Sequence, residues 1–161
     1  NARGLASDIS RAALKVAKQN ATTHKVNSRL ELRLSDWFSG ILPQPFDIIT
    51  SNPPYITESE MENLQPDVKN YEPAIALTDM GDGLSHYKAI LSRIREYLSE
   101  GFLLLFESGL YKVQEVAHLL SVAFPNEATT IINTILVEVV NMTKERKVHN
   151  SNSDLPYSEH L

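Results

Sequence analysis

Four consecutive residues, Asn52, Pro53, Pro54 and Tyr55, are the part of the sequence best suited to chemistry. They follow directly after the apolar stretch 46–49, which has the composition of a buried strand. The two prolines fix φ and remove two backbone donors, and Pro53 pushes Asn52 toward an extended backbone. The resulting stiff bend points the side-chain oxygen of Asn52 and the carbonyl of Pro53 the same way. Two fixed acceptors of this kind can hold both hydrogens of a planar NH₂ group and orient its nitrogen toward an electrophilic methyl group.

Residues 52–55, called the NPPY segment below, also have an alternative interpretation as a plain proline turn between a strand and a loop. Four specific residues directly after a buried strand favour the binding interpretation. In that interpretation Tyr55 lies flat against the planar amide or base that carries the nitrogen.

Acidic residues end two other strand candidates. Asp8 could accept two hydrogen bonds from a ribose diol, as acidic residues at this place do in nucleotide-binding folds, or it could cap the following helix. Asp36 could accept from an adenine amino group while Trp37 or Phe38 covers the base. The alternative is a turn aspartate followed by a core aromatic. When each site is considered alone, the structural role is favoured over ligand binding, both for Asp8 and for Asp36 with its aromatic neighbours.

The expected elements alternate between strand and helix. Ser10 can cap a helix that turns Ile9, Ala13, Val16 and Ala17 toward the core. The continuous apolar run 102–106 is typical of a strand buried on both faces. Residues 57–78 are expected to be loop with a helical turn near 58–64. The pattern predicts strands at 4–7, 30–34, 46–49 and 102–106, one or two strands within 131–140, and helices at 10–20, 84–98 and 113–120.

This alternation predicts an α/β fold in which a mostly parallel sheet has helices on both faces. Ligands of such sheets bind beyond the carboxyl ends of the strands. We therefore expect the strands that end at Asp8, Asp36 and Ile49 to be parallel. Asp8, Asp36 and Asn52 would then lie along one edge of the sheet.

The composition is that of an ordinary globular protein. Of 161 residues, 42% are apolar and 22% charged, which is enough for one domain, placed at residues 1–143 and followed by a disordered polar tail at 144–161. The net charge of −5 weighs mildly against a nucleic-acid partner. No apolar run is long enough to span a bilayer. The absence of cysteine excludes a disulfide scaffold, and the five histidines lack metal-ligand spacing, so no metal site is expected.

The NPPY segment resembles the catalytic motif of class I amino-methyltransferases, which act on amino groups of nucleic-acid bases or on glutamine amides. Residues 46–51, the stretch 70–77, the sequence Asp82-Gly83-Leu84 and Tyr87 narrow the resemblance to the protein-(glutamine-N5) methyltransferase family, often called HemK or PrmC. The resemblance extends from about residue 4 to residue 109. Members of this family methylate the Gly-Gly-Gln glutamine of peptide-chain release factors.

The resemblance implies a Rossmann-like class I fold and S-adenosylmethionine as the cofactor. Asp8 would bind the ribose, Asp36 and Trp37 the adenine end, and Asn52 would border both the cofactor and the substrate. The expected partner is a release factor, with no membrane and no direct nucleic-acid contact. The implied compartment is the cytoplasm, or the mitochondrion in a eukaryote.

The resemblance also implies a substrate site. Asn52 and Pro53 would hold the amide, and Tyr55 would pack beside it; these three are the candidate catalytic residues. Glu72 and Pro73 would shape the wall of the pocket, with a purely structural role for their loop as an equal alternative. The full substrate site would comprise Asn52, Pro53, Pro54, Tyr55, Glu72 and Pro73.

The sequence departs from the family pattern near both of its ends. The first strand and glycine-rich cofactor loop of the family would lie before Asn1, so we expect a gap between the strands that end at Asp8 and Ile49, with two exposed strand edges. We also expect this chain to bind S-adenosylmethionine weakly or not at all. Near the other end, Ser108 stands where the family has isoleucine in a Glu-Ile-Gly sequence.

Two other functions remain open. One is a nucleic-acid amino-methyltransferase, because the NPPY segment is common to both classes; charge and the Tyr71-Glu72-Pro73 sequence favour the protein substrate. The other is an inactive remnant that no longer binds cofactor. Calorimetry with S-adenosylmethionine would distinguish the remnant from both enzymes.

Overall fold

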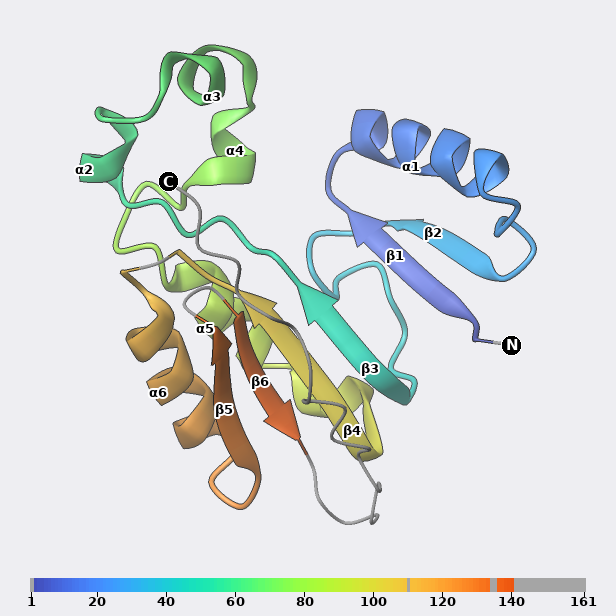
Figure 1. The fold of residues 1–161 in the computed structure, drawn as a ribbon. Helices are drawn as coiled ribbons and strands as arrows, with labels where there is room; N and C mark the ends of the chain where they lie inside the picture. The colour runs from blue at the N-terminus through green and yellow to red at the C-terminus, as the bar shows by residue number, and fades with distance from the viewer. Residues whose placement is uncertain (1, 110, 134–135, 141–161) are drawn as a thin grey trace, which may run out of the picture.

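The computed structural model describes residues 2–109, 111–133 and 136–140, and these residues form two sheets. The expected tail at 144–161 lies outside the described residues. The first sheet pairs β1 (Gly4–Asp8) with β2 (Leu30–Leu34) in parallel. The second has the order β3 (Phe46–Ser51), β4 (Leu98–Glu107), β6 (Leu136–Val140), β5 (Ala128–Asn133). The alternating α/β architecture and the predicted strands are confirmed (Figure 1).

Both parallel pairs fit the expected arrangement of the strand ends. β3 is parallel to β4, whereas β6 is antiparallel to its two neighbours. Figure 1 shows β1, β2 and β3 pointing the same way, so the residues after these three strands lie at one end of the molecule.

The two sheets are separated between β1 and β3. No hydrogen bond joins these strands among the described residues, and a cavity of about 670 Å³ lies between their N-terminal halves. Leu5 of β1 and Phe46 and Ile48 of β3 line the cavity. The side chain of Ile48 is 54% exposed. The expected gap between the strands that end at Asp8 and Ile49 is therefore present, with two unpaired edges.

Helix α1 (Arg11–Thr23) begins where the sequence predicted and ends three residues later. The side chain of Ser10 caps it by accepting the N–H of Ala13 at 3.2 Å. The predicted core face is wrong, because only Ala21 is buried and Val16 is 54% exposed. A helix resting on a two-stranded sheet finds too little surface to cover its apolar stripe.

The main core lies between β4 and two helices, α5 (Ser85–Leu91) and α6 (Val113–Ala123), which contact each other. Phe102, Leu104 and Phe106 alternate along β4 and are buried against these helices. Leu103 and Leu105 on the other face are only partly buried. The prediction that this strand is buried on both faces therefore holds for one face only.

The predicted helix at 84–98 is divided. α5 ends at Leu91, a 3-10 helix η1 (Ile94–Tyr97) follows, and β4 starts at once. Tyr97 explains the change, because its fully buried ring stacks on Phe38 at 4.3 Å and its hydroxyl donates to the carbonyl of Ile41 at 2.8 Å.

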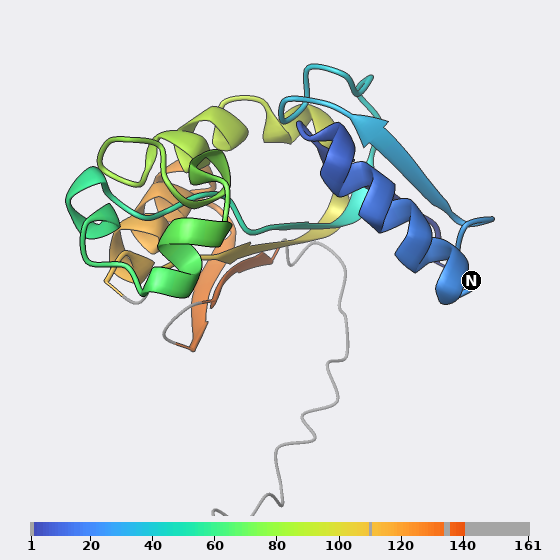
Figure 2. The same ribbon diagram turned by 90° about the horizontal axis from the view of Figure 1, so that it is seen from above.

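Residues 57–78 contain more helix than predicted: α2 (Glu58–Met61), α3 (Pro66–Tyr71) and α4 (Ala74–Leu77). Pro66 is the first residue of α3 and Pro73 is the N-cap of α4. The prolines thus start helices, which their fixed φ allows, and do not interrupt them. Figures 1 and 2 show this three-helix excursion beyond the end of β3.

Candidate functional site

The NPPY segment leaves the end of β3 with one side buried and one side open. Pro53 is fully buried, Asn52 is exposed, and Pro54 and Tyr55 are half-buried. Burial of Pro53 anchors the bend in the protein while the amide of Asn52 faces solvent. This is the arrangement that a substrate-holding acceptor requires.

Several contacts fix the chain directly after the bend. The N–H of Ile56 donates to the carbonyl of Leu77 at 2.9 Å, and Ile56 forms an isolated parallel bridge with Thr78. The backbone of Tyr55 lies so close to Gly83 that a Cβ there would stand 2.3 Å from the Tyr55 carbonyl oxygen. Gly83 also has φ +75°, so glycine is required on both grounds. The ring of Tyr55 rests on Gly109, where a Cβ would lie 3.0 Å from Cδ2.

The phenols near this bend are held neutral. Burial, and secondly the charge of Glu107, raises the pKa of Tyr55. Burial, with smaller contributions from Tyr55 and Glu107, also raises the pKa of Tyr87, whose hydroxyl donates to the carbonyl of Glu107 at 2.7 Å. Tyr55 is therefore protonated at neutral pH, which suits a packing wall and not a general base.

Asp8 and Asp36 come together at the ends of β1 and β2. The N–H of Ser35 donates to the carbonyl of Asp8 at 3.1 Å, and both carboxylates are exposed. Asp8 Oδ1 accepts the N–H of Ser10 at 2.7 Å, which is the local contact expected of the structural alternative. The N–H of Asp36 donates to Ser39 Oγ at 3.2 Å within a tight turn. Both side chains stay accessible to a ligand at this end of the sheet.

The two aromatic candidates have different surroundings. Phe38 stacks on Tyr97 and so has the role of a core aromatic. Trp37 is half-buried, has φ 48°, and lies 5.4 Å from the ring of His86 in a tilted arrangement. Of the two, Trp37 is the side chain still available to border a ligand.

Glu72 and Pro73 belong to the excursion that follows the bend. They occupy the junction of α3 and α4 on the excursion, where both are exposed. The structure thus brings Asp8, Asp36 and the NPPY segment to one end of the strands (Figure 1), whereas Glu72 and Pro73 are exposed between α3 and α4.

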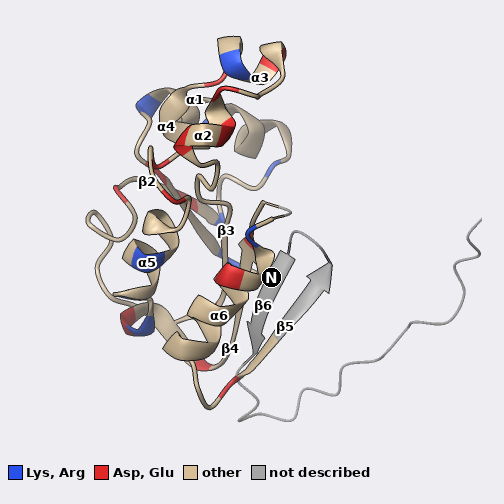
Figure 3. Ribbon diagram, turned by 90° about the vertical axis from the view of Figure 1, so that its left-hand side faces the viewer, with Lys and Arg blue, Asp and Glu red and all other residues tan. Residues whose placement is uncertain are grey.

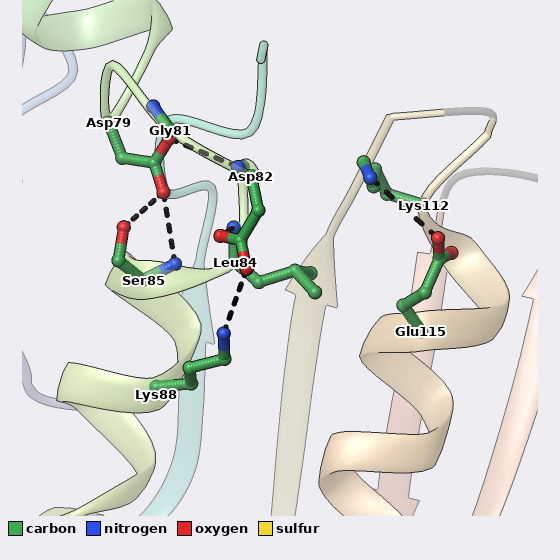
Figure 4. Close-up of polar contacts among 9 residues, drawn as sticks. Asp79, Gly81, Asp82, Leu84, Ser85, Lys88, Lys112 and Glu115 are labelled. Carbon is green, nitrogen blue, oxygen red and sulfur yellow. Dashed lines mark hydrogen bonds and ion pairs between the residues drawn. The ribbon is translucent and has the colours of Figure 1, made fainter. Parts of the chain in front are cut away.

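The sequence interpretation missed Asp79. Its carboxylate accepts the N–H groups of Gly81 at 2.9 Å and of Gly83 and Ser85 at 3.0 Å, together with the hydroxyl of Ser85 (Figure 4). Burial acts to raise the pKa of Asp79, but the hydrogen bonds from Ser85, Gly83 and Gly81 outweigh it and lower the pKa to about 2. Aspartate followed by glycine two and four positions later was the available signal, because Asp side chains close such turns.

Ser108 offers a test of the end of β4. Its fully buried hydroxyl has no hydrogen-bond partner among the described residues. We expect Ser108→Ala to keep or raise the free energy of unfolding, by up to about 1 kcal/mol, because an unpaired buried hydroxyl is removed. Urea denaturation measures the change.

Ser35→Ala is the matched control for that substitution. This second buried serine donates to the carbonyl of Trp37 at 2.7 Å and accepts the N–H of Gly40 at 2.8 Å. Its loss should cost about 1–2 kcal/mol. A loss of similar size for Ser108→Ala would show that the Ser108 hydroxyl is paired.

Two further observations concern only the described part of the chain. It contains no cluster of three or more histidine, cysteine or acidic side chains that could bind a metal ion. Its helices are all too short or too polar to cross a bilayer.

Comparison with known proteins gives a consistent picture. The family model "Methyltransferase small domain" matches residues 2–67. The chain is 48% identical over 122 residues to the release factor glutamine methyltransferase of Cereibacter sphaeroides, covering 76% of this chain and 44% of that protein. It is 37% identical over 130 residues to the Caulobacter vibrioides protein of the same name, covering 81% and 45%. The chain thus spans less than half of these relatives.

A solved structure also has a similar fold. A putative methyltransferase from Streptococcus mutans, in complex with SAH, superposes with a TM-score of 0.54 at 16% identity. The match covers 87% of this chain and 76% of that one. At this level of identity the similarity concerns the fold.

Proposed function

We propose that this chain, which matches a methyltransferase family model over residues 2–67 and is similar to release factor glutamine methyltransferases, transfers a methyl group from S-adenosylmethionine to the side-chain amide of a protein glutamine. The proposed substrate is the Gly-Gly-Gln glutamine of a peptide-chain release factor. The observation that supports this activity most directly is the NPPY segment, with Pro53 buried and Asn52 exposed at the end of β3. Such an activity fits the cytoplasm, or the mitochondrion of a eukaryote.

The residues at the ends of β1 and β2 fit the nucleoside half of this cofactor. Exposed carboxylates such as Asp8 and Asp36 accept hydrogen bonds from ribose hydroxyls and from an adenine amino group. Trp37 offers a half-buried ring beside them. When bound, S-adenosylmethionine supplies a methyl group on a positively charged sulfur.

The NPPY segment would orient the substrate. Asn52 Oδ1 and the carbonyl of Pro53 accept the two amide hydrogens, which aims the nitrogen and stabilises positive charge that develops on it. Tyr55 forms a neutral wall, since its raised pKa keeps the phenol protonated. Burial of Pro53 keeps these acceptors from moving apart.

Charge favours a protein over a nucleic acid as the substrate. Residues 57–85, which follow the NPPY segment, contain seven acidic side chains and one lysine. Figure 3 shows acidic residues on α2 and α3 of this excursion. Such a surface repels phosphates, whereas nucleic-acid sites attract them with lysine and arginine.

Methyl transfer tests the proposal. The protein in its natural full length is incubated with radiolabelled S-adenosylmethionine and a release factor, alongside the same factor with the Gly-Gly-Gln glutamine changed to alanine, DNA and RNA. We expect label on the unmodified factor alone. Label on a nucleic acid would replace this function with the base-methylating one, and no label on any substrate would contradict both.

A further inference from the structure

Asp79 closes the loop that follows the excursion. One carboxylate oxygen accepts the N–H groups of Gly81 and Gly83, and the other accepts the N–H and hydroxyl of Ser85 (Figure 4). The loop is therefore folded around a single side chain. Ser85 is also the first residue of α5, so the same carboxylate fixes where that helix begins.

This loop packs directly against the NPPY segment. Gly83 is buried and in van der Waals contact with the backbone of Tyr55, with no room for even a methyl group between them. The carbonyl of Gly81 also accepts the N–H of Glu58 at 3.3 Å, three residues after Tyr55. Displacement of the loop would thus free the chain at 55–58.

We propose that Asp79 is a positioning residue, which holds the NPPY segment in place through the contact between Gly83 and Tyr55. Asp79 itself does not touch substrate or cofactor in this arrangement. Its effect on methyl transfer rests on the proposed function, whereas its effect on the segment does not.

Asp82, in the same loop, provides a matched control. It accepts the N–H of Leu84 at 2.9 Å and pairs with Lys88 at 2.9 Å. Both partners lie on the α5 side, and the pair is solvent-exposed, where such pairs stabilise little. Asp82→Ala therefore removes an aspartate from this loop without removing the support behind Tyr55.

Amide hydrogen exchange tests the structural step. We expect exchange at Ile56 and Glu58 to become about tenfold faster in Asp79→Ala and to stay unchanged in Asp82→Ala. Asp79→Asn keeps acceptor capacity and should fall between the two, and it serves if the alanine variant does not fold. Equal exchange in Asp79→Asn, Asp82→Ala and the parent chain would overturn the proposal.

Kinetics of the full-length protein test the catalytic step. With rates expressed per S-adenosylmethionine-binding site, Asp79→Ala should lower kcat about tenfold to a hundredfold while cofactor affinity stays the same. Asp82→Ala should retain the parent kcat. If Asp79→Ala lost cofactor-binding sites and total rate in equal proportion, kcat per site would be normal. Asp79 would then act only in folding, and the proposal would be overturned. Absence of methyl transfer by the parent protein would contradict the proposed function and leave the exchange result valid.

Discussion

Asn52→Ala is expected to lower kcat for methyl transfer about a hundredfold or more, because it removes one of the two acceptors that fix the substrate nitrogen. Affinity for S-adenosylmethionine should change little, since Asp8 and Asp36, the two acidic candidates for binding the cofactor, are untouched. Asn52 is exposed, so the free energy of unfolding should also stay within about 0.5 kcal/mol. Steady-state kinetics and calorimetry on the full-length protein measure both effects.

Asn52→Asp is the control for this substitution. It keeps an acceptor of the same size and adds a charge near the positive sulfur, so we expect partial activity and cofactor affinity that is unchanged or higher. If Asn52→Ala retained near-normal turnover, Asn52 would be a turn residue and the proline-turn interpretation would be correct.

Tyr97→Ala should lower the free energy of unfolding by about 3–5 kcal/mol, the usual cost of removing a large buried aromatic. The ring of Tyr97 is fully buried against Phe38, and its hydroxyl reaches Ile41. Both partners belong to the loop that connects the two sheets. Urea denaturation followed by Trp37 fluorescence measures the change, because Trp37 is the only tryptophan and lies in that loop.

Two other substitutions calibrate this value. Tyr97→Phe keeps the stacked ring and removes one buried hydrogen bond, so it should cost about 1–2 kcal/mol. Tyr71→Ala changes a tyrosine that is 83% exposed and should stay within about 0.5 kcal/mol. A loss for Tyr97→Ala no larger than that for Tyr71→Ala would show that Tyr97 does not hold the loop.

Local sequence patterns predicted most of the elements, because alternation, capping and apolar runs act over a few residues. Ser10 caps α1 as expected, and β1 to β4 include all residues of the strands predicted at 4–7, 30–34, 46–49 and 102–106. Burial was predicted less well, since it depends on distant partners. Val16 shows this, because its helix lies on a sheet of only two strands. Tyr97 shows it too, because a hydrogen bond to Ile41 outweighs helical spacing.

For the candidate site, the order of strands was enough to place Asp8, Asp36 and Asn52 at one end. The supports of the NPPY segment could not be predicted in the same way. Gly83 and Gly109 contact Tyr55 from parts of the chain 28 or more residues away, and no pattern along the sequence indicates such a contact. The binding roles of Asp8, Asp36 and Asn52 remain predictions.

The separation of β1 from β3 affects how cooperatively the chain folds and unfolds. Each sheet has its own ladder of hydrogen bonds, so loss of one ladder does not require loss of the other. β1 and β2 pair residues 26 positions apart, such as Gly4 with Leu30, whereas β3 and β4 join Ile48 with Leu103. The shorter loop closes with less entropy loss, so the β1–β2 unit can form early and open early. Contacts such as that of Tyr97 with Phe38 therefore transmit free energy between two units that would otherwise melt separately.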